Sequence, residues 1–273
     1  MSPGAGRRGA VALAVIVVVI GGLALGARTL WHAAQTAVQP SGCDFGAYHV
    51  ELSRSENAAQ MVSVVLRRGL PERAAVLSLG AALQESKLDN IPSGQGDRDS
   101  VGILQQRPSQ GWGTAQNLSD VRYATGKFLD ALVKIDGWKT DSLAVVVQKV
   151  QVSADGSAYA KHEQQAQVMA DALTGKAPAA VTCDFDKPTK VAAMATVVAQ
   201  LKAELPVAAP AASGTTITVP GASWATAAWL VTHADRYGIA EVRCKGQRWQ
   251  RSGGWKADGS ASSAGVVATM ATV

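Results

Sequence analysis

Apolar residues recur at intervals of three and four residues between about positions 53 and 175, which is the spacing of one face of an α-helix. One such stripe runs from Ala58 to Val65. The next follows Pro71, a residue suited to a first helical turn, and ends at Glu85 before a polar, glycine-rich loop. Because no segment in this region alternates with the period of a strand, we predict an all-α region.

Three more helices are predicted here. One begins near Asp120 and ends near Gly137. The stretch "DSLAVVVQKVQV" fits a buried helix or a buried strand by its period alone, and its length and its helical neighbours favour a helix. The last helix runs from about Ala158 to Leu173 and stops at Gly175, because glycine readily adopts the left-handed conformation that commonly ends a helix.

The pattern changes after the helical region. Residues 184–214 indicate one more helix, followed by a linker rich in alanine and proline. Residues 215–273 combine the strand-like "TTITVP", an amphipathic helix that ends at Gly238, and a hairpin that turns at Lys245 and Gly246. This segment predicts a small α/β domain.

An uncharged apolar stretch near the N-terminus runs from Gly9 to Ala27 and matches the ~20 residues that cross a bilayer. Arg7 and Arg8 precede it and Arg28 follows it, which favours a cytoplasmic N-terminus and export of the rest of the chain. We therefore predict a single-pass membrane protein with an extracytoplasmic bulk. The alternative is a signal peptide whose cleavage releases a secreted protein, although the apolar run exceeds the usual length for such a peptide.

The fold class expected from these patterns is mainly α. The predicted organisation is a cytoplasmic tail at 1–9, a transmembrane helix or signal anchor at 10–27, a linker at 28–42, an all-α domain at 43–183, a helix and linker at 184–214, and a small α/β domain at 215–273.

The net charge of the chain indicates which kinds of binding partner to expect. The formal net charge of +5 is modest and dispersed along the chain, so no nucleic-acid partner is predicted. A mild basic excess suits an anionic cell wall or membrane face. The single predicted span also disfavours a transporter.

The chain has three cysteines, and export permits them to form disulfides. Cys43 and Cys183 bracket a segment whose ends could meet in a compact domain, so we predict a bridge between them. Cys244 is then left over. It is either a buried thiol or a residue that pairs between chains.

The candidate catalytic residue is Glu85, a carboxylate at the end of an apolar helix. Partial burial at such a position can raise the pKa of a glutamate and keep it protonated, so that it can act as a general acid. Glycoside cleavage requires this group, because the leaving sugar oxygen must be protonated. A solvated glutamate at a helix end is the alternative interpretation.

The residues around Glu85 are "QES", Asn90 and "DSVGILQQRPSQGWG". Together they resemble the lysozyme-like fold of lytic transglycosylases and goose-type lysozymes, in which a catalytic Glu followed by Ser ends a helix and a Ser-x-Gly-Leu-x-Gln segment faces it. Here Ser100, Gly102, Leu104 and Gln105 or Gln106 match that segment. The motifs "GDRDS" and "QQRPSQGWG" are also similar to a group of exported actinobacterial proteins built on this fold. The resemblance covers about 53–183.

The sequence departs from the family where a Tyr-Asn-Ala-Gly motif usually flanks the catalytic Glu. "VQKVQVSADGSAY" occupies its place, so Gln148, Gln151, Ser153 and Tyr159 become candidate sugar or peptide contacts. This departure puts efficient transglycosylase chemistry in doubt and leaves the fold expectation unchanged.

The resemblance implies Glu85 as the catalytic acid and base. Asp97 or Asp99 is a candidate second carboxylate that could orient a water for hydrolysis, and the alternative is an ion-pair cluster with Arg98 that holds the loop. The remaining candidate substrate contacts are Ser86, Asn90, Ser100, Gln105, Gln106, Arg107, Trp112, Gln151 and Tyr159.

Residues 224–255 resemble the small C-terminal module of actinobacterial wall-associated proteins related in fold to D,D-peptidases. Such peptidases need zinc ligands on separate elements, whereas His233 and Asp235 lie two residues apart on one predicted helix. We expect His233 on the helix surface, and we predict no metal and no cofactor.

Together, these features predict a membrane-anchored, extracytoplasmic enzyme. It would cleave the glycan strands of peptidoglycan with Glu85 as its general acid and base. The alternative is a non-catalytic peptidoglycan-binding or scaffolding protein of the cell envelope on the same fold.

Overall fold

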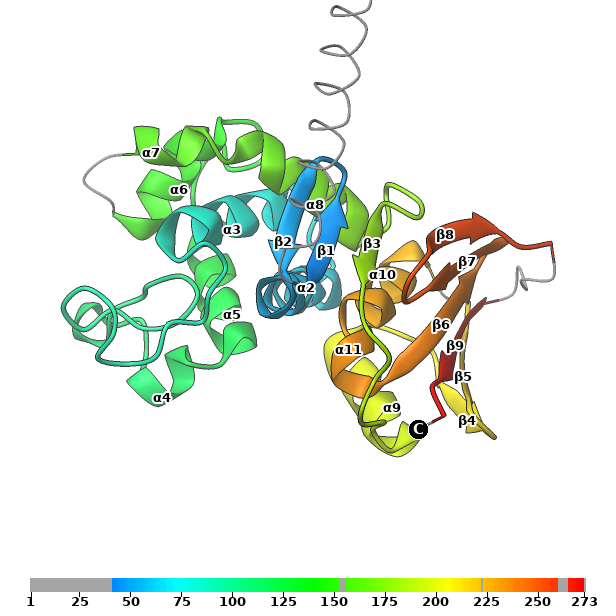
Figure 1. Ribbon diagram of the computed structural model, residues 1–273. Coiled ribbons are helices and arrows are strands. Elements are labelled where there is room, and N and C mark those ends of the chain that lie inside the picture. Colours follow the sequence, from blue (N-terminus) through cyan, green and yellow to red (C-terminus); the bar gives the residue numbers. More distant parts are fainter. Residues whose placement is uncertain (1–40, 153–155, 222, 260–264, 273) are drawn as a thin grey trace, which may run out of the picture. The chain divides into compact units, whose positions relative to one another are not determined.

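The computed structural model describes residues 41–152, 156–221, 223–259 and 265–272 (Figure 1). The chain from Ser41 to Val273 forms one compact unit. The predicted transmembrane helix at 10–27 and its flanking segments lie outside the described residues. Among the residues that are described, no helix has the length and apolar character needed to cross a membrane.

Helices make up most of the region up to residue 174, and their positions follow the hydrophobic stripes of the sequence. The helix predicted after Pro71 and the one predicted near Asp120 are confirmed, and the ambiguous stretch at 141–152 is helical. The helices are α2 (Leu52–Arg67), α3 (Glu72–Glu85), α4 (Ala115–Leu118), α5 (Val121–Leu132), α6 (Leu143–Gln151), α7 (Ser157–Ala160) and α8 (Glu163–Thr174), with a short 3-10 turn, η1 (Pro108–Gln110).

Local sequence explains several helix ends. Asp120 caps α5, because its Oδ1 atom accepts hydrogen bonds from the backbone N–H groups of Arg122 and Tyr123 at 2.8 and 3.2 Å. Gly175 ends α8 in the left-handed conformation, with a φ of 79°. The single helix predicted from Ala158 to Leu173 is instead two, α7 and α8.

The prediction of a mainly α chain is wrong, because the described residues form two antiparallel sheets and the fold is mixed α/β. The first sheet has the order β2-β1-β3, built from β1 (Gly42–Phe45), β2 (Tyr48–Glu51) and β3 (Val181–Asp184). These strands have four residues each, so each face carries only two side chains, which is too few to establish a period of two.

The predicted disulfide is confirmed and lies in this first sheet. Cys43 on β1 and Cys183 on β3 are direct partners in the strand register, and their sulfur atoms are bonded. Cys244 is a buried free thiol, and burial raises the pKa of this thiol to about 11.

The second sheet has six strands in the order β4-β5-β9-β6-β7-β8. The strand predicted at "TTITVP" and the hairpin predicted around Lys245 are confirmed as β5 and as β6 with β7. The sequence pattern did not identify the other three strands. The strands are β4 (Ala211–Ser213), β5 (Thr216–Pro220), β6 (Ile239–Cys244), β7 (Gln247–Gln250), β8 (Gly254–Ala257) and β9 (Gly265–Met270).

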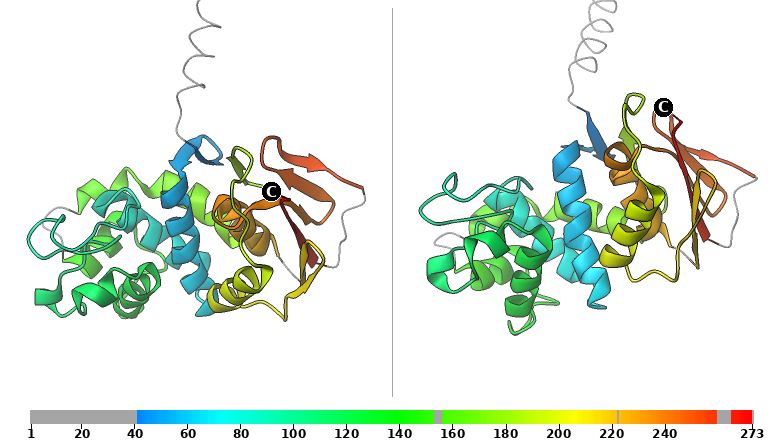
Figure 2. Two further views of the ribbon diagram at one scale, coloured as in Figure 1. Left: turned by 60° about the horizontal axis from the view of Figure 1, so that its bottom comes forward. Right: turned by 90° about the horizontal axis from the view of Figure 1, so that it is seen from below.

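Three helices accompany this sheet: α9 (Met194–Glu204), α10 (Trp224–Thr232) and α11 (Ala234–Tyr237). Every residue of α10 is buried, because this helix packs against α2 and α8 on one side and against β3 and β6 on the other. In both views of Figure 2, α2 lies between the helices of residues 115–151 and the pair α9 and α10, whereas α8 contacts α10 directly. One core therefore extends from α3 to β9.

The expectation that His233 lies on the helix surface is wrong. Its side chain is buried and stacks on the rings of Trp229 and Tyr237. Burial lowers the pKa of His233 to about 3, so this histidine is neutral in the folded protein at physiological pH. The predicted amphipathic helix ending at Gly238 is instead two helices, α10 and α11, and every residue of α10 is buried, so no solvent-facing side receives the histidine.

Candidate functional site

Glu85 is the last residue of α3, and its position follows from the way that helix is built. Pro71 occupies the N-cap of α3, and every residue from Ala74 to Leu83 is buried. The chain then turns away abruptly, because Lys87 and Leu88 both adopt positive φ angles, of 57° and 70°. Glu85 is thus the half-buried end of a helix whose middle is buried.

A tyrosine from a distant part of the chain holds the Glu85 carboxyl group. The hydroxyl of Tyr159, on α7, donates a hydrogen bond to Oε1 of Glu85 at 2.5 Å. The Tyr159 side chain is 2% exposed, so the donor is fixed by the core around its ring. Among the described residues, none forms a hydrogen bond with Oε2 of Glu85.

The "SVGILQQ" segment lies against the end of α3. The hydroxyl of Ser86 donates to the backbone carbonyl of Ile103 at 2.7 Å. The N–H of Gly102 donates to the carbonyl of Ile91 at 2.8 Å. A side chain at position 102 would collide with the carbonyl of Leu118, since an added Cβ would lie 2.3 Å from that oxygen, so glycine is required here.

Two glutamines tie this segment to its neighbours. The amide of Gln151 donates to the carbonyl of Leu104 at 2.9 Å, and the amide of Gln106 donates to the carbonyl of Ala124 at 3.2 Å. The Oε1 atoms of Gln106 and Gln151 are buried and accept no hydrogen bond from the described residues. A buried acceptor without a partner is costly, which is typical of a site that is completed by water or ligand.

The two aspartates proposed as a second carboxylate have different surroundings. Asp99 accepts from the backbone N–H of Ser109 at 2.8 Å and from Nε of Arg107 at 2.7 Å. These bonds, the one from Ser109 first, hold the pKa of Asp99 well below its usual range. Asp97 is 90% exposed and forms only a loose contact of 3.9 Å with Arg98. In the described part of the chain, no hydrogen bond joins Glu85 to either aspartate.

Several other predicted contacts are engaged within the protein. The amide of Asn90 donates to the carbonyl of Ser119, and the amide of Gln105 donates to the carbonyl of Gly102, at 2.7 and 2.8 Å. Ser100 is buried, and Trp112 is half-buried against the core. Ser153 lies outside the described residues. The described side chains among them form contacts within the protein that hold the loop.

Two residues with positive φ angles follow closely after Glu85. Outside glycine, seven described residues have positive φ angles. Lys87 and Leu88 come just after Glu85 in the chain, Gln105 lies in the segment whose Ile103 accepts from Ser86, and Val152 ends α6. Val152 is β-branched and 85% exposed. A left-handed conformation is energetically unfavourable for a β-branched residue, and backbone strain of this kind clusters at functional sites.

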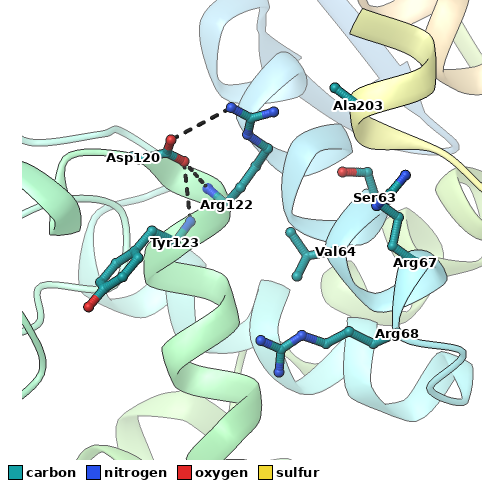
Figure 3. A pocket seen from close by; sticks show the side chains of 8 residues that line it. All are labelled: Ser63, Val64, Arg67, Arg68, Asp120, Arg122, Tyr123 and Ala203. Carbon is teal, nitrogen blue, oxygen red and sulfur yellow. Dashed lines mark hydrogen bonds and ion pairs between the residues drawn. The ribbon is translucent and has the colours of Figure 1, made fainter.

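A separate cavity of about 520 Å³ lies between α2, α5 and α9 (Figure 3). Three arginines line it: Arg67 and Arg68 at the end of α2, and Arg122 at the start of α5. Sequence reasoning missed this site. The only signal was the pair of arginines that ends one predicted helix and the arginine that begins another, and nothing in the hydrophobic pattern brings those two ends together.

Comparison with known proteins gives no family assignment, because no protein-family model matches the chain and no curated protein matches it. Among the described residues, no group of three or more His, Cys, Asp or Glu side chains is placed to hold a metal ion.

Proposed function

We propose that the protein cleaves the glycan strands of peptidoglycan, with Glu85 as general acid and then general base. The observation that carries this proposal is the hydrogen bond from the buried Tyr159 to Oε1 of Glu85. It orients a half-buried carboxyl group and leaves the second oxygen to meet a substrate. The positive φ angles of Lys87 and Leu88 just after Glu85 and the resemblance of "QES" and "SVGILQQ" to lysozyme-like enzymes support the same assignment.

The first chemical step is protonation of the bridging oxygen between two sugars. A proton on Oε2 of Glu85 passes to that oxygen as the bond to the anomeric carbon breaks, and an oxocarbenium-like sugar develops. Tyr159 keeps donating to Oε1 throughout, so the carboxyl group does not need to rotate between its protonated and ionised states. General acid catalysis of this kind contributes roughly 10²- to 10⁴-fold in rate.

The second step returns the proton to Glu85. In the lytic route, the ionised carboxylate accepts the proton of the C6 hydroxyl of the muramyl residue, whose oxygen bonds to the anomeric carbon and gives an anhydro product. In hydrolysis, a water takes the place of that hydroxyl. We favour the lytic route, because Asp99 is engaged by Ser109 and Arg107, while Asp97 is exposed. Neither is held as a water-orienting base.

Incubation of the full-length protein with purified peptidoglycan tests the proposal. Mass spectrometry of the soluble products should find anhydro-muramyl ends with the wild-type protein. Glu85→Gln keeps the size of the side chain and removes its ability to donate and recover a proton, so it should reduce product formation by about 10²-fold or more. Glu163→Gln, a matched change of another half-exposed glutamate, should leave the products unchanged.

The outcomes separate the alternatives. Reducing ends in place of anhydro ends, lost in Glu85→Gln, would indicate a hydrolase that uses the same acid. Peptidoglycan binding without any product would favour the non-catalytic envelope protein. Identical products from wild type and Glu85→Gln would remove Glu85 from the mechanism.

A further inference from the structure

The short helix α7, which carries Tyr159, depends on contacts with other elements to keep its place. It has four residues, and a helix of that length is not stable by itself in water. The backbone N–H of His162, just after α7, donates to the carbonyl of Tyr159 at 3.0 Å. The carbonyl of His162 in turn accepts from the N–H of Ala166 in α8 at 2.9 Å. The position of Tyr159 is therefore linked through the backbone to that of His162.

The side chain of His162 contacts the residue next to Glu85. Its Nε2 atom lies 3.1 Å from Oε1 of Gln84. An amide oxygen only accepts hydrogen bonds, so Nε2 of His162 is the donor. Two adjacent residues at the end of α3, Gln84 and Glu85, thus accept hydrogen bonds from two residues that lie three positions apart, His162 and Tyr159. The two bonds attach the end of α3 to the chain between α7 and α8.

The protonation state of His162 suits this contact. Burial lowers the pKa of His162, and the positive charge of Lys161 lowers it further, so the ring is neutral at neutral pH and carries one proton. The side-chain oxygen of Gln84 selects Nε2 as the nitrogen that holds this proton. Protonation at lower pH adds a second proton at Nδ1 and leaves the Nε2 donor in place, so both forms of the ring can hold Gln84.

We propose that His162, through its hydrogen bond to Gln84, holds Tyr159 in position to donate to Glu85. This makes His162 a second positioning residue of the cleavage reaction, and in that respect the inference rests on the proposed function. The core around the Tyr159 ring fixes the ring itself, and the contact of His162 fixes the chain that carries it. Among the described residues, His162 forms no hydrogen bond with Glu85, so its effect on the acid passes through Tyr159.

Cleavage kinetics of the full-length protein test this role. His162→Phe keeps a ring and removes the donor, so kcat should fall about fivefold, the factor that corresponds to one net hydrogen bond, while KM stays constant. His162→Gln keeps an N–H near the position of Nε2 and should retain most of the wild-type kcat. Gln84→Met removes the acceptor instead and should give the same loss as His162→Phe. Equal kcat for the wild type and His162→Phe would contradict the proposal.

A double variant shows whether His162 acts through Tyr159. In a Tyr159→Phe background the hydroxyl that His162 positions is already absent, so adding His162→Phe should lower kcat no further. An independent structural role would instead give the full fivefold loss again, and that result would overturn the proposal.

Proton NMR of the substrate-free protein separates this inference from the proposed function. The Tyr159 hydroxyl is buried and hydrogen-bonded, so its proton should give a slowly exchanging downfield signal that Tyr159→Phe removes. We expect His162→Phe to weaken this signal and His162→Gln to retain it. His49→Phe is the matched control, because it changes the histidine of β2, which pairs with Asp44; its signal and kcat should equal those of the wild type.

The signal and the kinetics have separate meanings. A Tyr159 hydroxyl signal that is unchanged in His162→Phe overturns the positioning role, whether or not the protein cleaves peptidoglycan. A signal that responds to His162→Phe in a protein without cleavage activity supports the contact and counts against the proposed function alone.

Discussion

The contact between Glu85 and Tyr159 joins residues 74 positions apart, and it explains how a half-buried carboxyl group keeps one orientation. The tyrosine ring is packed in the core, so the hydroxyl cannot follow a carboxylate that moves. A group that transfers protons must be held close to its productive geometry, since a displacement of about 1 Å can cost about 10²-fold in rate. We assign Tyr159 as the residue that positions Glu85.

Tyr159→Phe tests this role because it keeps the ring and removes only the hydroxyl. We expect kcat for peptidoglycan cleavage to fall between about tenfold and 10²-fold while KM changes little, because the tyrosine acts on the carboxyl group and not on the glycan. Loss of the hydrogen bond to Glu85 should lower the free energy of unfolding by about 1 kcal/mol. Initial rates and urea denaturation measure the two effects.

The control for this variant is Tyr48→Phe, which removes a hydroxyl from the half-buried tyrosine of β2. Its cleavage rate should equal that of the wild type. If Tyr159→Phe retains the wild-type kcat, or if its KM rises while kcat is constant, then Tyr159 does not position the acid.

At the scale of elements, the loop between α3 and η1 is held by Asp99, which bonds both Ser109 and Arg107. These bonds lower the pKa of Asp99 in the folded protein, so they stabilise the fold only while the carboxylate is ionised. The stabilisation is complete when the pH lies above the pKa of Asp99 in the unfolded chain, which is about 4. It is lost as the pH falls from there toward the lower pKa of Asp99 in the folded protein.

Asp99→Asn should therefore lower the Tm at neutral pH, and the difference from the wild type should narrow as the pH falls below about 4. Thermal unfolding of both proteins between pH 7 and pH 2 measures this. Asp97→Asn is the matched control, because Asp97 is exposed and makes only a distant contact with Arg98; its Tm should follow the wild type at every pH. A constant gap between Asp99→Asn and the wild type would contradict the assigned cause.

The sequence pattern predicts some of the helices and strands and not others. The longer helices α2, α3 and α5 follow from apolar spacing, because each buries one stripe or most of its surface. The four-residue helices α4 and α7 are too short to show such a stripe. The strands β1, β2 and β3 carry no comparable signal, since they are four residues long. The sequence singled out Glu85 and Tyr159, but only the fold brings them into contact. The arginine cavity was missed because its residues come from the ends of separate helices.

At the scale of the whole molecule, the helices and the six-stranded sheet share one core. The helix α10 connects them, since it packs against α2, α8, β3 and β6 with all of its residues buried. The N-terminal strand β1 also pairs with β3, which follows the last helix of the α2 to α8 region. The disulfide between Cys43 and Cys183 locks this pairing and closes a loop with a sequence separation of 140 residues.

Removal of the disulfide should lower the stability of the whole unit and not of one element alone. In the chain-entropy view, closing so long a loop destabilises the unfolded chain by about 5 kcal/mol, and measured losses are about 2 to 5 kcal/mol. The double variant Cys43→Ala and Cys183→Ala should therefore unfold at lower urea concentration in a transition monitored by circular dichroism and by tryptophan fluorescence. Because the core is continuous, both signals should shift together.

A reducing agent provides the control within the same experiment. Dithiothreitol should lower the stability of the wild type toward that of the double variant and should leave the double variant unchanged, because its remaining thiol, Cys244, is buried and unpaired. Burial raises the pKa of Cys244 to about 11, so this thiol should also resist alkylation at neutral pH until the protein unfolds. Equal stability of wild type and double variant, or a shift in only one of the two signals, would show that the bridge stabilises less than the whole unit.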